Sequence, residues 1–273
     1  MNLINISNNI RKTIIEIANR SRSAHVGTSL SCVDILTELY FDILRIDNWE
    51  ERDIFVMSKA HGAMSLYSTL AERGIISREL LYGYNQNNGT LPAHLDIFTA
   101  KGIEVSAGSL GHGFNIALGI AYGFLKKKFD KKIYALIGDG ESQEGSIWEG
   151  ALFGSKLKLS NFTAVIDYNN LQGYGRANDI CHYEPIKEKW EAFGWHVIEI
   201  DGNNIESVID ACAMGRAVTE KPVMILAYTI PGKGVDFMEN DYHWHGSPPN
   251  YEQAMTALKE LRTLGGKIRS EHE

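Results

Sequence analysis

Short runs of β-forming residues alternate with helical patterns along most of the chain, and this alternation constrains the fold more than any other feature. The runs cover residues 53–58, 133–137, 162–168, 195–200 and 223–229. Such mostly apolar runs are typical of strands buried on both faces, and strands separated by helices form parallel sheets. We therefore predict an α/β fold of three layers, a parallel sheet with helices on both faces.

The helical patterns have recognisable bounds. Apolar residues at helical spacing predict helices over residues 8–18, 32–43, 63–73 and 114–127. Residues 21–27 are polar and contain a glycine, which predicts a loop. Asn250 and Gln253 have the spacing of an N-cap and its capping-box partner, so a last helix should begin there and stop near Gly265 and Gly266. We assign residues 1–249 to one domain and residues 250–273 to a C-terminal helix and polar tail.

Composition excludes several classes of function. The formal net charge is −7 and the basic residues are scattered, so nucleic acid is not an expected partner. The chain has no basic segment followed by an apolar run and no apolar stretch long enough for a bilayer, which predicts a soluble cytoplasmic protein without a membrane partner. Cys32, Cys181 and Cys212 are odd in number and widely spaced, unlike a disulfide framework or a zinc site.

Polar residues follow two of the predicted strands. Gly138, Asp139 and Gly140 come after one strand, and Asn169 follows the next. Ligands of open α/β sheets bind beyond the carboxyl ends of the strands, and Mg²⁺ prefers oxygen ligands that it shares with phosphates. The two loops therefore suit a metal and a diphosphate, although Gly-Asp-Gly taken alone fits an ordinary strand-to-helix turn equally well.

The two loops together, joined by a segment with Glu144 and Gly145, a helix and a strand, resemble the signature of thiamine diphosphate enzymes. Within that superfamily the chain resembles the N-terminal half of transketolase over nearly all of its length. The matching stretches are SAHVG at 23–27, FVMSKAH at 55–61, LPAH at 91–94, GSLG at 108–111, GDG at 138–140, NNL at 169–171 and HWHG at 243–246. Their order also agrees with that family.

The resemblance implies the thiamine diphosphate-binding fold, in its diphosphate-binding domain, and a role for each matching residue. Asp139, Asn169 and the carbonyl of Leu171 would bind Mg²⁺, Ca²⁺ or Mn²⁺. The residues implied to contact the cofactor are His61, Gly108, Ser109, Leu110, Gly138, Asp139, Gly140, Asn169 and His245. The implied sugar-facing catalytic residues are His25, His94 and His245, whose imidazoles suit proton transfer near neutral pH.

Two further comparisons with that family are informative. Glu144 corresponds to an acid at the interface between the two cofactor-binding domains, or else it is a carboxylate that favours a helix start. The chain departs from the family's pattern at Ala60, Ser109, His112 and Ser247, where glycine, proline, glutamine and lysine are usual. The remaining histidines, expected to be structural or exposed, are His182, His196, His243 and His272.

The pyrimidine-binding and C-terminal domains of a transketolase are absent from this chain. The resemblance therefore implies the N-terminal subunit of a split transketolase, which transfers a two-carbon ketol unit between sugars together with a separate C-terminal subunit, two copies of each. Met1 and the polar C-terminus favour a natural subunit over a truncated piece. The alternatives are a subunit of a 2-oxoacid decarboxylating complex or of a deoxyxylulose-type synthase, and a non-catalytic domain of the same fold.

Overall fold

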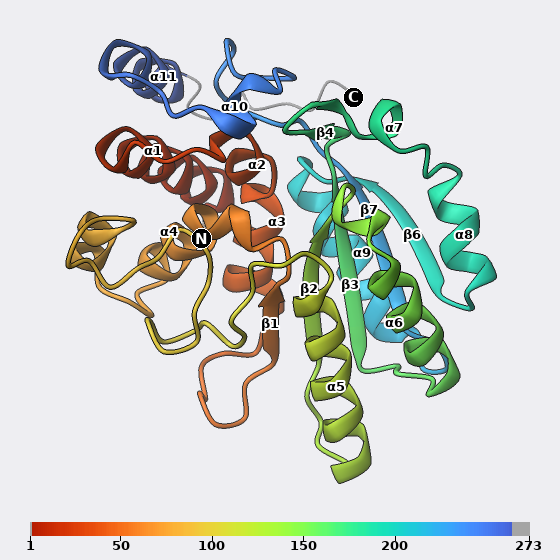
Figure 1. Ribbon diagram of the computed structural model, residues 1–273. Coiled ribbons are helices and arrows are strands. Elements are labelled where there is room, and N and C mark those ends of the chain that lie inside the picture. The colour runs from red at the N-terminus through yellow and green to blue at the C-terminus, as the bar shows by residue number, and fades with distance from the viewer. Residues whose placement is uncertain (1, 264–273) are drawn as a thin grey trace.

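A five-stranded parallel sheet forms the middle layer of the molecule (Figure 1). The computed structural model describes residues 2–263. The strands are β1 (Ile54–Met57), β2 (Ile133–Gly138), β3 (Phe162–Tyr168), β6 (His196–Asp201) and β7 (Val223–Tyr228). Their order across the sheet is β1-β2-β3-β7-β6, and every neighbouring pair is parallel. The predicted parallel sheet is confirmed.

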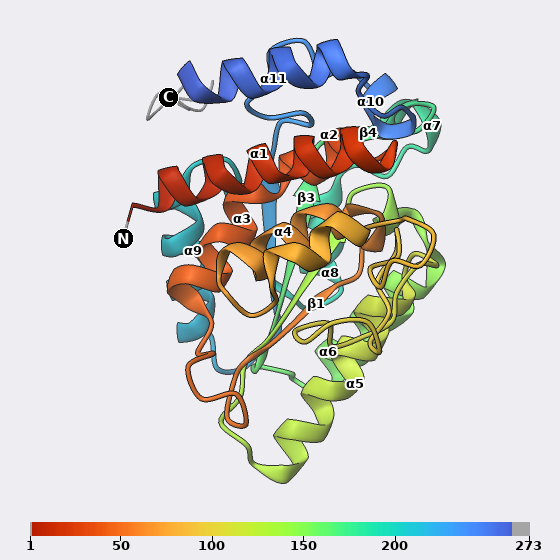
Figure 2. The same cartoon turned by 90° about the vertical axis from the view of Figure 1, so that its left-hand side faces the viewer.

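Helices cover both faces of this sheet (Figures 1 and 2). One face carries α1 (Leu3–Ser21), α2 (Val26–Ser31), α3 (Val33–Glu38), α4 (Ala63–Glu72) and α9 (Ile205–Ala217), and the other carries α5 (His112–Lys127), α6 (Gly145–Lys156) and α8 (Ile186–Ala192). Successive strand residues point to opposite faces, so Phe55 and Met57 enter one apolar core while Ile54 and Val56 enter the other. The three predicted layers are therefore present.

Shorter elements complete the fold. They are a π-helical turn (Leu39–Ile43), the 3₁₀ turns Ala60–Gly62, Arg78–Gly83 and Glu141–Gln143, a small hairpin of β4 (Leu171–Gln172) and β5 (Gly175–Arg176), and the helices α7 (Ala177–Ile180), α10 (His243–Gly246) and α11 (Tyr251–Thr263). Among residues 2–263, no helix combines the length and the apolar character that crossing a bilayer requires.

The last helix, α11, packs against α1. The predicted capping box is formed, because the backbone N–H of Asn250 donates to Gln253 and the N–H of Gln253 donates to Asn250, each at 2.9 Å. The amide of Asn8 on α1 donates to the carbonyl of Leu261 at 2.8 Å. The predicted stop near residues 265–266, and His272, lie outside the described residues.

Several predicted boundaries near the N-terminus were wrong. Helix α1 starts at Leu3, five positions earlier than residue 8, since the side chain of Asn2 accepts from the N–H of Asn5 and caps it. The loop predicted at residues 21–27 is shorter, because Ser21 still belongs to α1 and α2 already begins at Val26. Residues 32–43 are not one regular helix, since α3 passes into the π-helical turn at Leu39.

Candidate active site

A cavity of about 400 Å³ lies at the carboxyl ends of β1, β2 and β3. Every predicted metal, cofactor, catalytic or interface residue lines this cavity except Ser109, which is exposed beside it. These lining residues are His25, His61, His94, Gly108, Leu110, Gly138, Asp139, Gly140, Glu144, Asn169, Leu171 and His245. The structure thus brings together residues that are far apart in the sequence.

The oxygen donors converge because two of their strands are neighbours. Gly138 at the end of β2 pairs in register with Asp167 near the end of β3, so Asp139 lies next to the loop that follows β3. The carboxylate of Asp139 accepts from the N–H of Gly140 at 2.7 Å and from the N–H of Asn170. Asn170 has a φ of 56°, a left-handed conformation that asparagine tolerates. The turn after β3 therefore holds Asn169 near Asp139 at the carboxyl end of the sheet.

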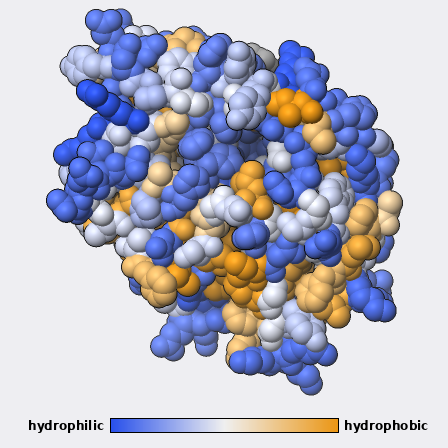
Figure 3. Space-filling view, in the orientation of Figure 1, coloured by the Kyte–Doolittle hydropathy of each residue, from blue (hydrophilic) through white to orange (hydrophobic). Residues whose placement is uncertain are grey.

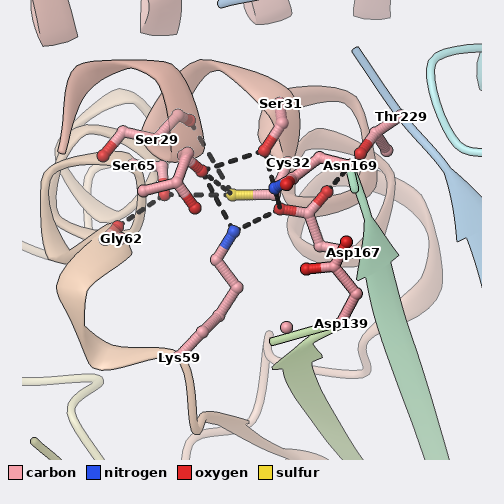
Figure 4. A network of polar contacts seen from close by, with 12 residues as sticks. Ser29, Ser31, Cys32, Lys59, Gly62, Ser65, Asp139, Asp167, Asn169 and Thr229 are labelled. Carbon is pink, nitrogen blue, oxygen red and sulfur yellow. Dashed lines mark hydrogen bonds and ion pairs between the residues drawn. The ribbon is translucent and has the colours of Figure 1, made fainter. Parts of the chain in front are cut away.

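An ion pair lies beneath these donors, between Lys59 after β1 and Asp167 on β3 (Figure 4). The side chains are 1% and 0% exposed. The Lys59 ammonium also donates to the carbonyl of Thr28 at 3.0 Å, which joins the start of α2 to the ends of both strands. Removal of one partner of such a buried pair is strongly destabilising, since it leaves an uncompensated charge.

The negative charge here is not fully compensated. Burial, followed by the nearby charge of Asp167, raises the pKa of Asp139 to about 7, against the effects of the two backbone donors and of Lys59. One ammonium thus faces two carboxylates. Within residues 2–263 no cluster of three His, Cys, Asp or Glu side chains is arranged for a metal. A site with one carboxylate and amide or carbonyl oxygens suits Mg²⁺ that shares phosphate oxygens, and it does not suit zinc.

Four imidazoles surround the rest of the cavity. The ring of His25 lies 5.5 Å from that of His61, 6.1 Å from that of His94 and 5.2 Å from that of His245, measured between centroids. His25 has a φ of 68°, and its N–H donates to the carbonyl of His245 at 2.9 Å, which links the start of α2 to α10.

Three of these rings, those of His25, His61 and His245, are kept neutral. Burial lowers the pKa of His25, with help from His94 and Lys59, and lowers that of His61 well below its usual value. Burial, then the charges of His25 and Lys59, lowers the pKa of His245 to about 4. A neutral imidazole offers one donor and one acceptor nitrogen, so the group is suited to bind and orient a polyhydroxylated molecule.

Several lining residues were not singled out from the sequence. Those with the clearest roles in the geometry are Thr28, Lys59, Glu141 and Gln172, together with Asp167 below the floor of the cavity. Lys59 stands in the matching stretch at 55–61, just after a strand, and Asp167 lies within a strand, just before the matching stretch at 169–171. Their pairing could not be inferred, because it depends on β1, β2 and β3 being adjacent in this order.

A family model described as transketolase, thiamine diphosphate binding domain, matches residues 4–266. The chain belongs to the transketolase family. Relatives of similar length include one of the subunits of the apulose-4-phosphate transketolase of Phocaeicola vulgatus, 40% identical over 96% of this chain and 94% of the relative. Another is the 6-deoxy-6-sulfo-D-fructose transketolase subunit SqwG of a Clostridium species, 40% identical over 95% of this chain and 96% of the relative.

Larger transketolases match this chain with only part of their length. Human transketolase is 34% identical over 93% of this chain, which corresponds to 41% of the human protein. The crystal structure of the Campylobacter jejuni transketolase superposes with a TM-score of 0.89 at 30% identity, over 96% of this chain and 43% of that one. The predictions of the family, of its fold and of an N-terminal transketolase subunit, a transferase that works as part of a complex, are thus confirmed.

Proposed function

We propose that this transketolase subunit holds the diphosphate of thiamine diphosphate and its Mg²⁺, and presents histidines to a sugar whose two-carbon ketol unit is transferred. The observation that carries the proposal is that one cavity contains both groups of residues, the oxygen donors at Asp139 and Asn169 and the four imidazoles. Two separate cavities would not support transfer between a cofactor and a sugar.

The residues present fit this cofactor. Asp139, Asn169 and the Leu171 carbonyl would hold the metal, and Asp139 carries the incompletely compensated charge that a divalent cation offsets. Gly138 and Gly108 leave room for phosphate, because an added Cβ would come no closer than 3.9 Å to any side chain. When bound, thiamine diphosphate supplies the carbanion chemistry that ketol transfer requires.

The protein's own contribution is to position the sugar and to move protons. The imidazoles of His25, His94 and His245 would bind sugar hydroxyls and exchange protons with them, since imidazole nitrogens can both donate and accept. His61, whose pKa is lowered well below its usual value by burial, would contact the cofactor. Ser109, exposed on the loop before α5, would contact the cofactor through its backbone.

A second subunit would complete the site. Relatives that match this chain over nearly their whole length are named as subunits, which supports a separate chain that supplies the pyrimidine-binding part. Apolar side chains gather on the face that carries α5 and α6 (Figure 3), where Ile116, Leu152 and Phe153 are exposed. Glu144, the N-cap of α6, makes no side-chain cap bond, and we assign it to the interface. We expect a cytoplasmic assembly with two copies of each subunit.

The anionic end of the substrate would be bound mainly by that second subunit. Two relatives are named for apulose 4-phosphate and for 6-deoxy-6-sulfo-D-fructose, both anionic sugars. Among the described residues that line the cavity, Lys59 is the one permanent cation, and Asp167 already pairs with it. This division assigns the cofactor's diphosphate to the present chain and the sugar's charged group to its partner.

The proposal is tested by reconstitution. The purified chain is mixed with the product of a neighbouring gene that encodes a transketolase C-terminal part, and ketol transfer is assayed with Mg²⁺, thiamine diphosphate and a panel of ketose donors. We expect activity only from the mixture. Full activity from this chain alone would overturn the need for a partner, and turnover of 2-oxoacids but not ketoses would favour a different thiamine diphosphate system.

A further inference from the structure

Asp167 is the most heavily bonded carboxylate below the cavity. Its side chain is 0% exposed and accepts from the ammonium of Lys59, the hydroxyl of Ser31 at 2.6 Å and the hydroxyl of Thr229. It also accepts from the side-chain amide of Asn169 at 3.3 Å. Figure 4 shows these donors converging on Asp167, with Asp139 beside it. Three elements, α2, the loop after β1 and the end of β7, therefore hold one carboxylate in place.

The contact with Asn169 decides which way its amide group faces. The amide nitrogen of Asn169 points to Asp167, while its oxygen accepts from the N–H of Leu171 at 3.0 Å. An ionised carboxylate only accepts and a backbone N–H only donates, so just one of the two amide orientations satisfies both neighbours. The reversed amide would place an oxygen against a carboxylate and an NH₂ group against an N–H.

We infer that Asp167 is a positioning residue, which orients the Asn169 amide so that its oxygen, and not its nitrogen, is offered to the divalent cation. The inference rests on the proposed function, in which Asn169 is a metal ligand. The N–H of Leu171 engages one of the two lone pairs of the Asn169 oxygen, which leaves the other for a cation. Lys59 contributes by pairing with the same carboxylate, which holds Asp167 in place beneath Asn169.

The test measures metal affinity directly. The chain is assembled with its partner subunit, saturated with thiamine diphosphate and titrated with Mn²⁺, and free Mn²⁺ is followed by electron paramagnetic resonance. We expect Asp167→Asn to lower Mn²⁺ affinity by at least about 10-fold, as for other residues that orient metal ligands. The charge-conserving double variant Asp167→Asn with Asn169→Asp should recover most of the lost affinity, because a carboxylate at position 169 has no wrong orientation.

The control for folding removes both buried charges. Lys59→Met with Asp167→Asn removes both members of the buried ion pair, so neither is left without its partner and this variant should fold even where Asp167→Asn does not. It should also bind Mn²⁺ weakly, and adding Asn169→Asp to it should raise the affinity again. Wild-type affinity in Asp167→Asn and in Lys59→Met with Asp167→Asn would overturn the inference, as would failure of Asn169→Asp to restore binding in either of these two backgrounds. A wild-type complex that binds no Mn²⁺ would instead overturn the proposed metal site.

Discussion

The carboxylate of Glu141 accepts a hydrogen bond from the hydroxyl of Ser58 at 2.5 Å. The same carboxylate accepts from the N–H of Gly111 at 2.8 Å and from the N–H of Gly138 at 3.2 Å. Glu141 is 1% exposed, and its three donors come from the end of β1, the loop before α5 and the end of β2. One buried side chain thus joins the glycine-containing loops that line the cavity.

Replacing Glu141 by glutamine should weaken these three hydrogen bonds. Both carboxylate oxygens accept hydrogen bonds, and glutamine would turn an NH₂ group toward a backbone donor. We expect the free energy of unfolding to fall by about 1–3 kcal/mol, measured by urea denaturation. Glu149→Gln, at an exposed position of α6, is the matched control and should change it by less than about 0.5 kcal/mol. Equal urea midpoints for Glu141→Gln and the wild type would refute the prediction.

Asp139→Ala should abolish metal-dependent binding of thiamine diphosphate to the assembled complex. The substitution removes the carboxylate nearest the proposed cation, and Mg²⁺ sites of this kind use few protein carboxylates. Calorimetric titration of the complex with thiamine diphosphate, with and without Mg²⁺, measures the effect. Asp210→Ala on the exposed side of α9 should bind like the wild type. Unchanged affinity in Asp139→Ala would mean that the metal ligands are misassigned.

His94→Ala should separate binding from turnover. His94 lines the cavity, is not among the proposed metal ligands and is assigned to the sugar. We therefore expect cofactor affinity to stay within error while kcat falls about 10²- to 10⁴-fold. Steady-state kinetics and a cofactor titration of the same preparation give both values. His196→Ala, at the exposed first residue of β6, is the control and should leave kcat unchanged. Normal turnover in His94→Ala would remove this residue from the catalytic set.

Glu38 on α3 should make stability depend on pH. It is buried, and neither of its oxygens accepts a hydrogen bond from the described residues. Burial, then the charges of Asp42 and Asp34, raises its pKa from 4.5 to about 8, and Cys212 faces it from α9. A raised folded-state pKa favours the protonated form, so the stability from Glu38 is complete below about pH 4.5 and is lost as the pH rises through about 8.

Glu38→Gln mimics the protonated side chain and gives the measurement. Its free energy of unfolding should exceed that of the wild type by about 1–3 kcal/mol at about pH 8 and match it at about pH 4.5. Urea denaturation at both pH values tests this. Glu16→Gln, exposed on α1, should show no such dependence. A difference between Glu38→Gln and the wild type that stays constant with pH would rule out this titration.

The local patterns of the sequence were sufficient for the class of fold and for the two polar loops. Apolar runs predicted every strand of the main sheet, because burial on both faces leaves a continuous signal in the residues themselves. The reciprocal cap between Asn250 and Gln253 was also predicted, because both partners lie within one helical turn of each other. The start of α1 was predicted too late, although Leu3, Ile6 and Ile10 already follow helical spacing and the side chain of Asn2 caps the helix.

What the sequence by itself determined is therefore the sheet, the family and the positions of Asp139, Asn169 and the histidines. Only the tertiary structure decided that Lys59 pairs with Asp167, that Asp167 faces Asn169 and that Glu141 joins three loops. These contacts link residues as far as 108 positions apart. They follow from the order β1-β2-β3-β7, which places the four strand ends side by side, and strand order leaves no mark in the local pattern of any one strand.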